Sequence, residues 1–335
     1  MMAAERRRTK RRPASGGRYT SRSGAPGSGQ GNTGRRLSRS ERMRRRRKRL
    51  IRALAAWAVC ILLMLLIAAG TMRLIGMAAT SKKRQLRSQG IECLASGDYN
   101  GAIEAFDMAL EKSGERAQDF NKDVLQYRAE AELKLLDYEA ALHTYELLAQ
   151  QEPKEPVWGY LRAICSARLN TPEEAFKLYE EASAMEKEGQ ETPGRLPALM
   201  AVGSAWTDAG EYQKAMAFYE GALEKGIEDA QIYNQMGICQ MAEEDYEGAA
   251  DSFDKGLGLL AAAYGTSRET AVLKAAIPAE DTWNLDALKE LSYNRAVVLE
   301  YQQDYGKALS CFQEYVDAFG AEEDALHEIE FLKTR

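Results

Sequence analysis

Histidine and paired cysteines are scarce in this sequence. It has two histidines (His143 and His327) and five cysteines with no CxxC pair among them. This scarcity counts against a zinc module, a disulfide framework and most histidine-dependent catalysis. The sequence also has no glycine-rich phosphate loop, no GxSxG elbow and no HExxH helix. We therefore expect no enzymatic activity, and no catalytic, cofactor-binding or metal-binding residue.

Positive charge is concentrated at the beginning of the chain. Residues 1–52 carry 19 Lys and Arg against two Asp and Glu, a net charge of +17. Residues 88–335 carry 21 basic and 48 acidic residues, a net charge of −27. The stretch 13–40 is rich in Gly, Ser, Pro and Arg and has almost no apolar side chain to bury. Because such a stretch cannot offset the entropy lost on ordering, we expect residues 1–50 to form a disordered basic tail.

An uncharged apolar run, ALAAWAVCILLMLLIAAGTM, follows the tail at residues 53–72. Twenty residues at 1.5 Å per residue make about 30 Å of helix, the thickness of the hydrocarbon core of a bilayer. The run is longer than the apolar core of a signal peptide, and its basic preface is long as well. Small residues near Ala78 and Ala79 leave cleavage open as an alternative. We expect one transmembrane helix over residues 51–79, which acts as a signal anchor.

Eight basic residues between positions 42 and 52 indicate the orientation of this helix, because positive charge is retained on the cytoplasmic side. We expect a single-pass protein of the cell membrane, with its N-terminus in the cytoplasm and residues 80–335 outside it. Basic residues also follow the run, at Arg73 and within 82–87, so the inverted topology stays open. No Asn-x-Ser/Thr acceptor occurs from residue 88 onward, which favours a bacterial exported domain.

The basic residues at 42–52 are also suited to contact anionic lipid headgroups, at about 1 kcal/mol for each charge near a cytoplasmic leaflet. Proteins that bind nucleic acid interleave aromatic side chains for base stacking. Tyr19 is the only aromatic residue before the apolar run. We therefore expect a membrane partner but no nucleic-acid partner.

A short pattern recurs six times after the apolar run. Each copy has an alanine, an aromatic residue four positions later, and a glycine or alanine twelve positions earlier. The alanine and the aromatic residue share one face of a helix. The earlier small residue falls on a preceding helix, where it lets the two backbones approach closely. The turn between them carries a helix-capping residue, mostly Asp, and Thr171 before Pro172 in the third copy. The pattern predicts six helical hairpins, with central alanines Ala102, Ala141, Ala175, Ala215, Ala249 and Ala308.

This pattern resembles the tetratricopeptide repeat, a unit of about 34 residues with small, small and aromatic signature positions. The central alanines are 39, 34, 40, 34 and 59 residues apart. The resemblance implies an all-α solenoid, in which neighbouring hairpins stack to bury their apolar faces. We expect repeats over 83–320, a helical insertion at 264–288 and a capping helix at 321–335. The hairpins are expected at 83–116, 122–155, 156–189, 196–229, 230–263 and 289–320.

In this family, the first helices of successive hairpins line a concave groove that contacts partner peptides. The resemblance therefore implies a scaffold that binds a protein or peptide partner in such a groove. Amide side chains pair with a peptide backbone, and tyrosines give contact area at low entropy cost. The candidate groove residues are Arg87, Gln126, Tyr127, Glu130, Tyr160, Met200, Ser204, Asn234, Gln235, Tyr293, Asn294 and Tyr301.

Some family members capture a C-terminal carboxylate with a clamp of Lys, Asn and Arg. Asn234 and Asn294 occupy suitable places here, but the cations that the clamp requires do not accompany them. We therefore do not expect this specialised function. Four cysteines fall on apolar helix positions of different repeats, where we expect buried thiols, although a disulfide between adjacent hairpins stays open. They are Cys93, Cys165, Cys239 and Cys311.

These features together predict a membrane-anchored interaction platform outside the cytoplasm, which assists exported proteins or serves an envelope complex. Two alternatives stay open. The protein could be a structural subunit of a fixed envelope or cell-division assembly, or an adaptor that faces the cytosol.

Overall fold

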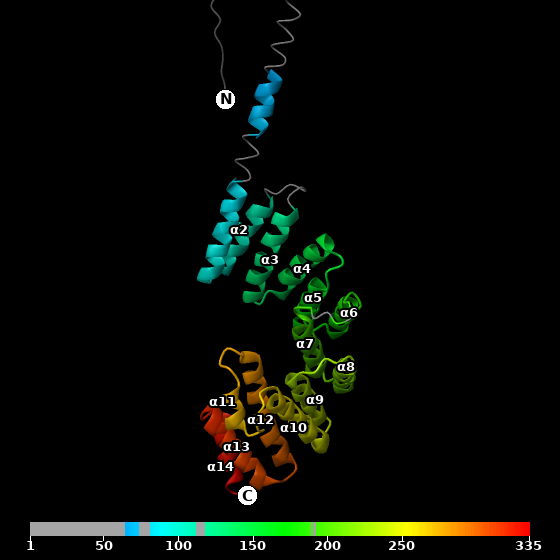
Figure 1. The fold of residues 1–335 in the computed structure, drawn as a ribbon, viewed down its shortest axis with the longest axis vertical. Coiled ribbons are helices and arrows are strands. Elements are labelled where there is room, and N and C mark those ends of the chain that lie inside the picture. Colours follow the sequence, from blue (N-terminus) through cyan, green and yellow to red (C-terminus); the bar gives the residue numbers. More distant parts are fainter. Residues whose placement is uncertain (1–63, 74–80, 112–117, 188, 190–191) are drawn as a thin grey trace, which may run out of the picture. The chain divides into compact units, whose positions relative to one another are not determined.

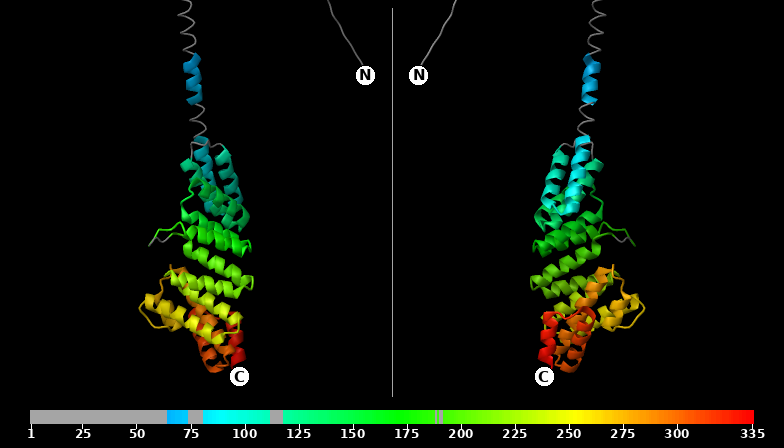
Figure 2. Two further views of the ribbon diagram at one scale, coloured as in Figure 1. Left: turned by 90° about the vertical axis from the view of Figure 1, so that its right-hand side faces the viewer. Right: turned by 90° about the vertical axis from the view of Figure 1, so that its left-hand side faces the viewer.

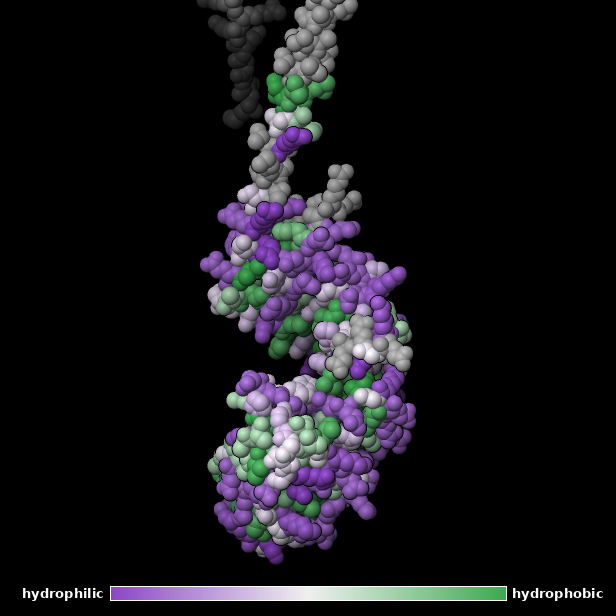
Figure 3. Space-filling view, in the orientation of Figure 1, coloured by the Kyte–Doolittle hydropathy of each residue, from purple (hydrophilic) through white to green (hydrophobic). Residues whose placement is uncertain are grey.

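The computed structural model describes residues 64–73, 81–111, 118–187, 189 and 192–335. The chain divides into two units, Met1–Met72 and Arg73–Arg335. In the first unit, residues 64–72 are helical, and their large apolar side chains expose 61–75% of their surface (Figure 3). No helix in the described ranges is both long and apolar enough to cross a membrane. The basic tail and residues 53–63 of the expected transmembrane run lie outside the described residues.

The second unit consists of helices and their connections throughout its described part (Figure 1). The all-α solenoid expected from the sequence is confirmed. A helix over residues 81–96 comes first, α11 (Thr270–Ala276) is a short helix between two hairpins, and α14 (Glu323–Leu332) comes last. The other helices are α2 (Tyr99–Glu111), α3 (Gln118–Lys134), α4 (Tyr138–Gln151), α5 (Pro156–Arg168), α6 (Pro172–Ser183), α7 (Arg195–Asp208), α8 (Tyr212–Glu224), α9 (Ala230–Ala242), α10 (Tyr246–Ala263), α12 (Thr282–Tyr301) and α13 (Tyr305–Phe319).

The helices of the second unit pair into hairpins that stack in chain order (Figure 2). The second helix of each hairpin contacts the first helix of the next, as in α4 with α5, α6 with α7 and α10 with α12. The first helices also contact one another, in the order α5, α7, α9 and α12. These first helices therefore lie side by side and form one continuous face of the solenoid.

The recurring small residue makes room for the recurring aromatic ring. A Cβ atom added to Gly90 would lie 2.4 Å from the Phe106 ring, and one added to Gly237 would lie 2.3 Å from the Phe253 ring. All six central alanines are fully buried. We expected the small residue to let the two backbones of a hairpin approach closely. In the structure, the space left by its missing side chain is filled by the aromatic ring of the same hairpin. Close packing of this ring against the small residue holds the two helices of each hairpin together.

The turns inside the hairpins share one backbone conformation. Each has a residue with positive φ at the same place, which is glycine in two turns and Leu136, Asn170, Glu244 or Gln303 in the others. The following aspartates cap the second helices; Asp137, for example, accepts a hydrogen bond from the backbone N–H of Ala140. Thr171 is the N-cap residue of α6, as expected, but its hydroxyl donates to the carbonyl of Ser166 and makes no capping hydrogen bond to the helix.

The long interval before the last hairpin extends the helices on both sides of it. Helix α10 continues to Ala263, and α12 begins at Thr282, where Asp281 accepts from the backbone N–H of Asn284. Helix α11 packs against α12 and α13. At the end of the stack, α14 buries Ala325, Ile329 and Leu332 against α13 and covers its apolar face.

Candidate functional site

Three adjoining concavities follow the face formed by the first helices, from α5 to α14. The first has a volume of about 310 Å³ and lies between α5, α7, α9 and the start of α12. Helical spacing places Met200 and Ser204 on the same side of α7. The wall opposite them is Gln235 of α9 with Trp283 and Glu290 of α12.

The second and third concavities continue this surface along α12. The second, of about 390 Å³, lies where α12 meets the α13–α14 turn, and it shares Glu290 with the first. The third, of about 440 Å³, lies between α12 and α14 and shares Tyr293 with the second. We call the three together the groove. Because neighbouring concavities share a lining residue, they adjoin one another, and together they are lined by α5, α7, α9, α12, α13 and α14.

The groove is acidic toward its α14 end. The second concavity is lined by Asp286, Glu290, Glu322 and Asp324, and its one lysine, Lys289, is already paired with Glu322 at 2.6 Å. Burial raises the pKa of Glu290, and the negative charge of Asp286 adds to that rise. The carboxylates of this concavity outnumber its single lysine, so a cation that enters it meets an excess of negative charge.

The third concavity combines carboxylates with aromatic rings. Burial raises the pKa of Glu300, and the neighbouring Glu328 raises it further through its charge and a hydrogen bond. Tyr301 is 56% exposed, and its ring stacks on Tyr246 with centroids 5.0 Å apart. The Arg335 guanidinium lies in the same concavity.

A ladder of amides joins α9 to α12 beneath the groove. Asn294 donates to the side-chain oxygen of Asn234 at 2.9 Å, and Asn234 donates to Glu290 at 2.8 Å. Asn234 is fully buried, so it supports the groove and does not contact a partner. The prediction that Asn234 is a groove residue is therefore wrong. A partner carboxylate placed here would meet Glu290, which agrees with the absence of a carboxylate clamp.

Six of the twelve candidate residues line the groove and one further candidate, Tyr160, is displaced from it. Tyr160 is fully buried, with its ring 5.3 Å from that of Tyr179 and its Cβ 3.6 Å from the position that a Cβ of Gly194 would take. Tyr160 is therefore inaccessible to a partner, which corrects the expectation for this residue. The six groove residues are Met200, Ser204, Gln235, Tyr293, Asn294 and Tyr301.

The remaining candidates lie at the other end of the stack. Arg87 forms a two-bond ion pair with Asp123 and lies over the Tyr127 ring at 5.3 Å. This pair raises the pKa of Arg87. Gln126 and Glu130 are exposed on the same helix, α3. Arg87 is thus held by intramolecular partners, and these four residues form a separate surface from the groove.

Sequence reasoning missed several groove residues. Trp283 and Asp286 lie on the early turns of α12, ahead of the expected repeat start at residue 289. The capping signal at Asp281 does predict a long helix through Trp283, but the repeat spacing gives no sign that its first turns line the groove. Glu328 and Phe331 come from α14, which was expected to cap the stack but not to line a binding surface.

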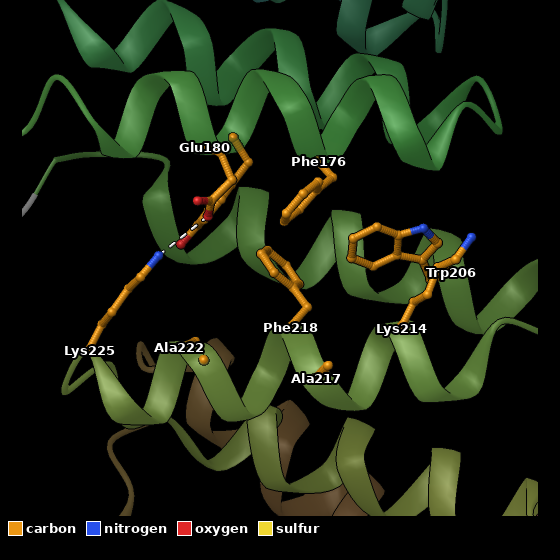
Figure 4. A pocket seen from close by; sticks show the side chains of 10 residues that line it. Phe176, Glu180, Trp206, Lys214, Ala217, Phe218, Ala222 and Lys225 are labelled. Carbon is orange, nitrogen blue, oxygen red and sulfur yellow. Dashed lines mark hydrogen bonds and ion pairs between the residues drawn. The ribbon is translucent and has the colours of Figure 1, made fainter.

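A different pocket, of about 390 Å³, opens between α6 and α8 (Figure 4). Its aromatic wall is formed by Phe176, Trp206 and Phe218, whose ring centroids lie 5.1–5.6 Å apart. At its rim, Lys225 of α8 pairs with Glu180 of α6 at 3.4 Å. The pocket is apolar and lies on the second helices, away from the residues that line the groove.

The four repeat cysteines form no disulfide within the described ranges. Cys93, Cys165, Cys239 and Cys311 are free thiols there, and burial raises the pKa of Cys165 to about 12. A thiol with such a pKa is inert as a nucleophile at neutral pH. No cluster of His, Cys, Asp and Glu within the described residues could hold a metal ion.

Residues 128–187, which cover most of the second and third hairpins, match one family model. That family is the tetratricopeptide repeat. Tetratricopeptide repeat proteins are generally non-enzymatic scaffolds that bind protein or peptide partners. A search of curated proteins finds no match.

Solved tetratricopeptide repeat structures share the fold. The type IV pilus biogenesis factor PilW is 14% identical, with a TM-score of 0.50 over 75% of this chain and 98% of its own. The C-terminal part of a tetratricopeptide repeat protein from Cytophaga hutchinsonii is 13% identical, with a TM-score of 0.50 over 78% of this chain and 94% of its own. At such low identity the likeness concerns the fold alone.

Proposed function

We propose that the protein is a membrane-anchored scaffold whose groove binds an extended segment of a polypeptide partner. The observation that carries this proposal is the continuity of the groove, whose three concavities share Glu290 and Tyr293. A continuous track across several helices suits an extended chain better than a small molecule in a single closed cavity.

The side chains of the groove are suited to this task. Gln235 and Ser204 offer hydrogen bonds to a peptide backbone, and Tyr293 and Tyr301 offer flat apolar area. The amide ladder beneath holds α9 and α12 in fixed register, so little order is lost when a partner binds.

The anchor in this proposal is the apolar run 53–72, with the basic residues 42–52 at the cytoplasmic headgroups. The repeats then lie outside the cytoplasm of a bacterial cell, in reach of exported polypeptides or of an envelope complex. Anchoring confines the groove to the membrane surface and raises its effective concentration for partners there.

Site-specific crosslinking tests the groove. We would place a photoreactive amino acid at Ser204 or Gln235, and at the exposed positions Gln213 of α8 and Lys255 of α10 as controls. We expect adducts from both groove positions, and those from position 235 should disappear when Ser204→Arg fills the first concavity. Equal adducts from the control positions would contradict the proposal. Many adducts of different mass would indicate varied clients, whereas a single stoichiometric adduct would indicate a subunit of a fixed assembly.

The topology needs its own test. A reporter enzyme that is active only in the cytoplasm, fused after Arg335, should be inactive, and one that is active only outside should work. The reverse result would place the groove in the cytosol. It would leave peptide binding unaffected but would remove exported proteins and envelope complexes as partners.

A further inference from the structure

We infer that the third concavity, between α12 and α14, binds an arginine side chain of the partner segment. This inference rests on the proposed function, because it names the chemistry of the polypeptide that the groove binds.

The first observation is that a guanidinium already lies there. The guanidinium of Arg335 is 4.6 Å from the ring centroid of Phe331 and 5.7 Å from that of Tyr305. A planar, weakly hydrated guanidinium stacks on aromatic faces better than a compact ammonium does. The concavity thus has a demonstrated fit for this group, supplied by the chain itself.

The second observation is that carboxylates border the same space. Glu300 of α12 and Glu328 of α14 line the concavity together with Tyr293 and Tyr301. Glu328 has an exposed neighbour, His327, at 3.5 Å. Arg335 is near enough to Glu300 to lower its pKa through its charge, but burial and Glu328 together keep that pKa raised. Two carboxylates held this close repel each other, and a guanidinium relieves the repulsion.

The third observation is the volume. The concavity measures about 440 Å³ with the Arg335 side chain among its lining groups. Open space thus remains beside the resident guanidinium. A second arginine can enter next to it or can displace it onto the surface, and the second concavity continues the acidic surface for flanking basic residues.

The basic tail of the same chain is excluded as the occupant in this arrangement. Residues 42–52 carry the densest positive charge of the chain, but the anchor proposed at 53–72 holds them on the opposite side of the bilayer. The net charge of −27 over residues 88–335 also disfavours nucleic acids and anionic lipids at this surface. An arginine-bearing polypeptide therefore fits best.

The test compares three peptides that differ only at two positions. Each is a twelve-residue segment of Ser, Asn and Tyr, with arginine, lysine or the neutral isostere citrulline at those positions. Binding to the full chain in nanodiscs, which separate the tail from the repeats, would be measured by fluorescence anisotropy at constant ionic strength. We expect the arginine peptide to bind about tenfold more tightly than the citrulline peptide, with the lysine peptide between them.

Matched variants localise the effect. Glu300→Gln with Glu328→Gln should bring the affinity for the arginine peptide close to that for the citrulline peptide. Glu220→Gln with Glu224→Gln removes the same charge from the exposed side of α8 and should change neither affinity. Arg335→Gln vacates the concavity and should raise the affinity for the arginine peptide about threefold. Lys333→Gln removes an equal charge next to it, outside the concavity, and should have a smaller effect.

The outcomes separate the inference from the proposed function. Equal binding of the arginine and citrulline peptides, lost in Ser204→Arg, would overturn the arginine pocket and keep the groove. An arginine preference that survives Glu300→Gln with Glu328→Gln, or that falls equally in the α8 control, would also overturn the pocket. No binding of any of the three peptides would count against both the groove and the pocket.

Discussion

A small residue and an aromatic ring sixteen positions apart are the smallest repeated unit of this protein. In three hairpins the small residue is glycine, and the ring occupies the volume that any side chain there would need. Rings of this kind are fully buried at Phe106, Phe253 and Phe312. The stability of each hairpin therefore depends on a pair of residues that the sequence alone reveals by their spacing.

Gly237→Ala tests this pair. The new Cβ would overlap the Phe253 ring, so we expect a loss of about 1–3 kcal/mol in the free energy of unfolding. Gly221→Ala is the matched control, because nothing lies within 4 Å of its added Cβ and alanine favours a helix by about 0.5–1 kcal/mol. Urea unfolding would measure both. Phe253→Leu should recover part of the loss when combined with Gly237→Ala, and simple additivity of the two substitutions would argue against the steric pair.

Leu136 is an unfavourable residue for its backbone conformation. Its φ is 59° and its side chain is 68% exposed, whereas two other hairpins have glycine at this place. An L-residue in the left-handed region costs about 1–2 kcal/mol.

Leu136→Gly removes this strain, and we expect a net gain of up to about 1 kcal/mol after the greater entropy of glycine in the unfolded chain is counted. Leu135→Gly, one residue earlier, has no positive φ to relieve and should be destabilising. Thermal unfolding of both variants would show the opposite signs. A loss of stability in Leu136→Gly would mean that its side chain makes contacts that matter more than the strain.

At the scale of elements, the extended start of α12 and the packing of α14 decide where the groove lies. The sequence pattern predicted six hairpins and a capping helix, because small residues, aromatics and caps recur at fixed spacing. It did not predict that Tyr160 and Asn234 would be buried, since they hold the same repeat position as the accessible Met200. Their exposure depends on which side chains of other helices pack against them, such as the Tyr179 ring at Tyr160 and the Glu290 carboxylate at Asn234. Repeat spacing carries no information about which side chains from other helices cover a given position.

The two faces of α14 should respond differently to truncation. Ile329 is 7% exposed and packs on α13, whereas Leu326 is 41% exposed. We expect Ile329→Ala to cost about 2 kcal/mol and Leu326→Ala less than about 0.5 kcal/mol. Hydrogen exchange should show lost protection in α14 itself and in the neighbouring α12 and α13 only, because solenoid repeats communicate through their neighbours. Faster exchange throughout α3 and α4 would contradict this local effect.

At the scale of the molecule, charge is divided between the two ends of the chain. The first 52 residues carry +17 and residues 88–335 carry −27. The surface of the second unit is mostly hydrophilic in the view of Figure 3. This division suits a chain whose tail and repeats face different surroundings, and it sets the sign of the partner that the repeats attract.

Binding of the arginine peptide should depend on pH in a defined direction. The pKa values of Glu290 and Glu300 are raised, so these groups take up protons at a higher pH than ordinary glutamates as the pH falls. Protonation removes negative charge, so the affinity for the arginine peptide should decrease as the pH falls through the raised pKa values of these groups. The citrulline peptide is the control and should show little change. Anisotropy titrations between pH 7 and pH 4 would check this, and a rise in arginine-peptide affinity on acidification would contradict it.

The contacts between neighbouring hairpins have a mechanical consequence. A stack held together junction by junction behaves as a spring, since a small rotation at each junction adds up along its length. A segment bound across α7, α9 and α12 would clamp the junctions beneath it and leave those nearer α2 free to bend. Tension from a bound partner would then stretch the hairpins nearer α2 first and leave the binding surface undistorted.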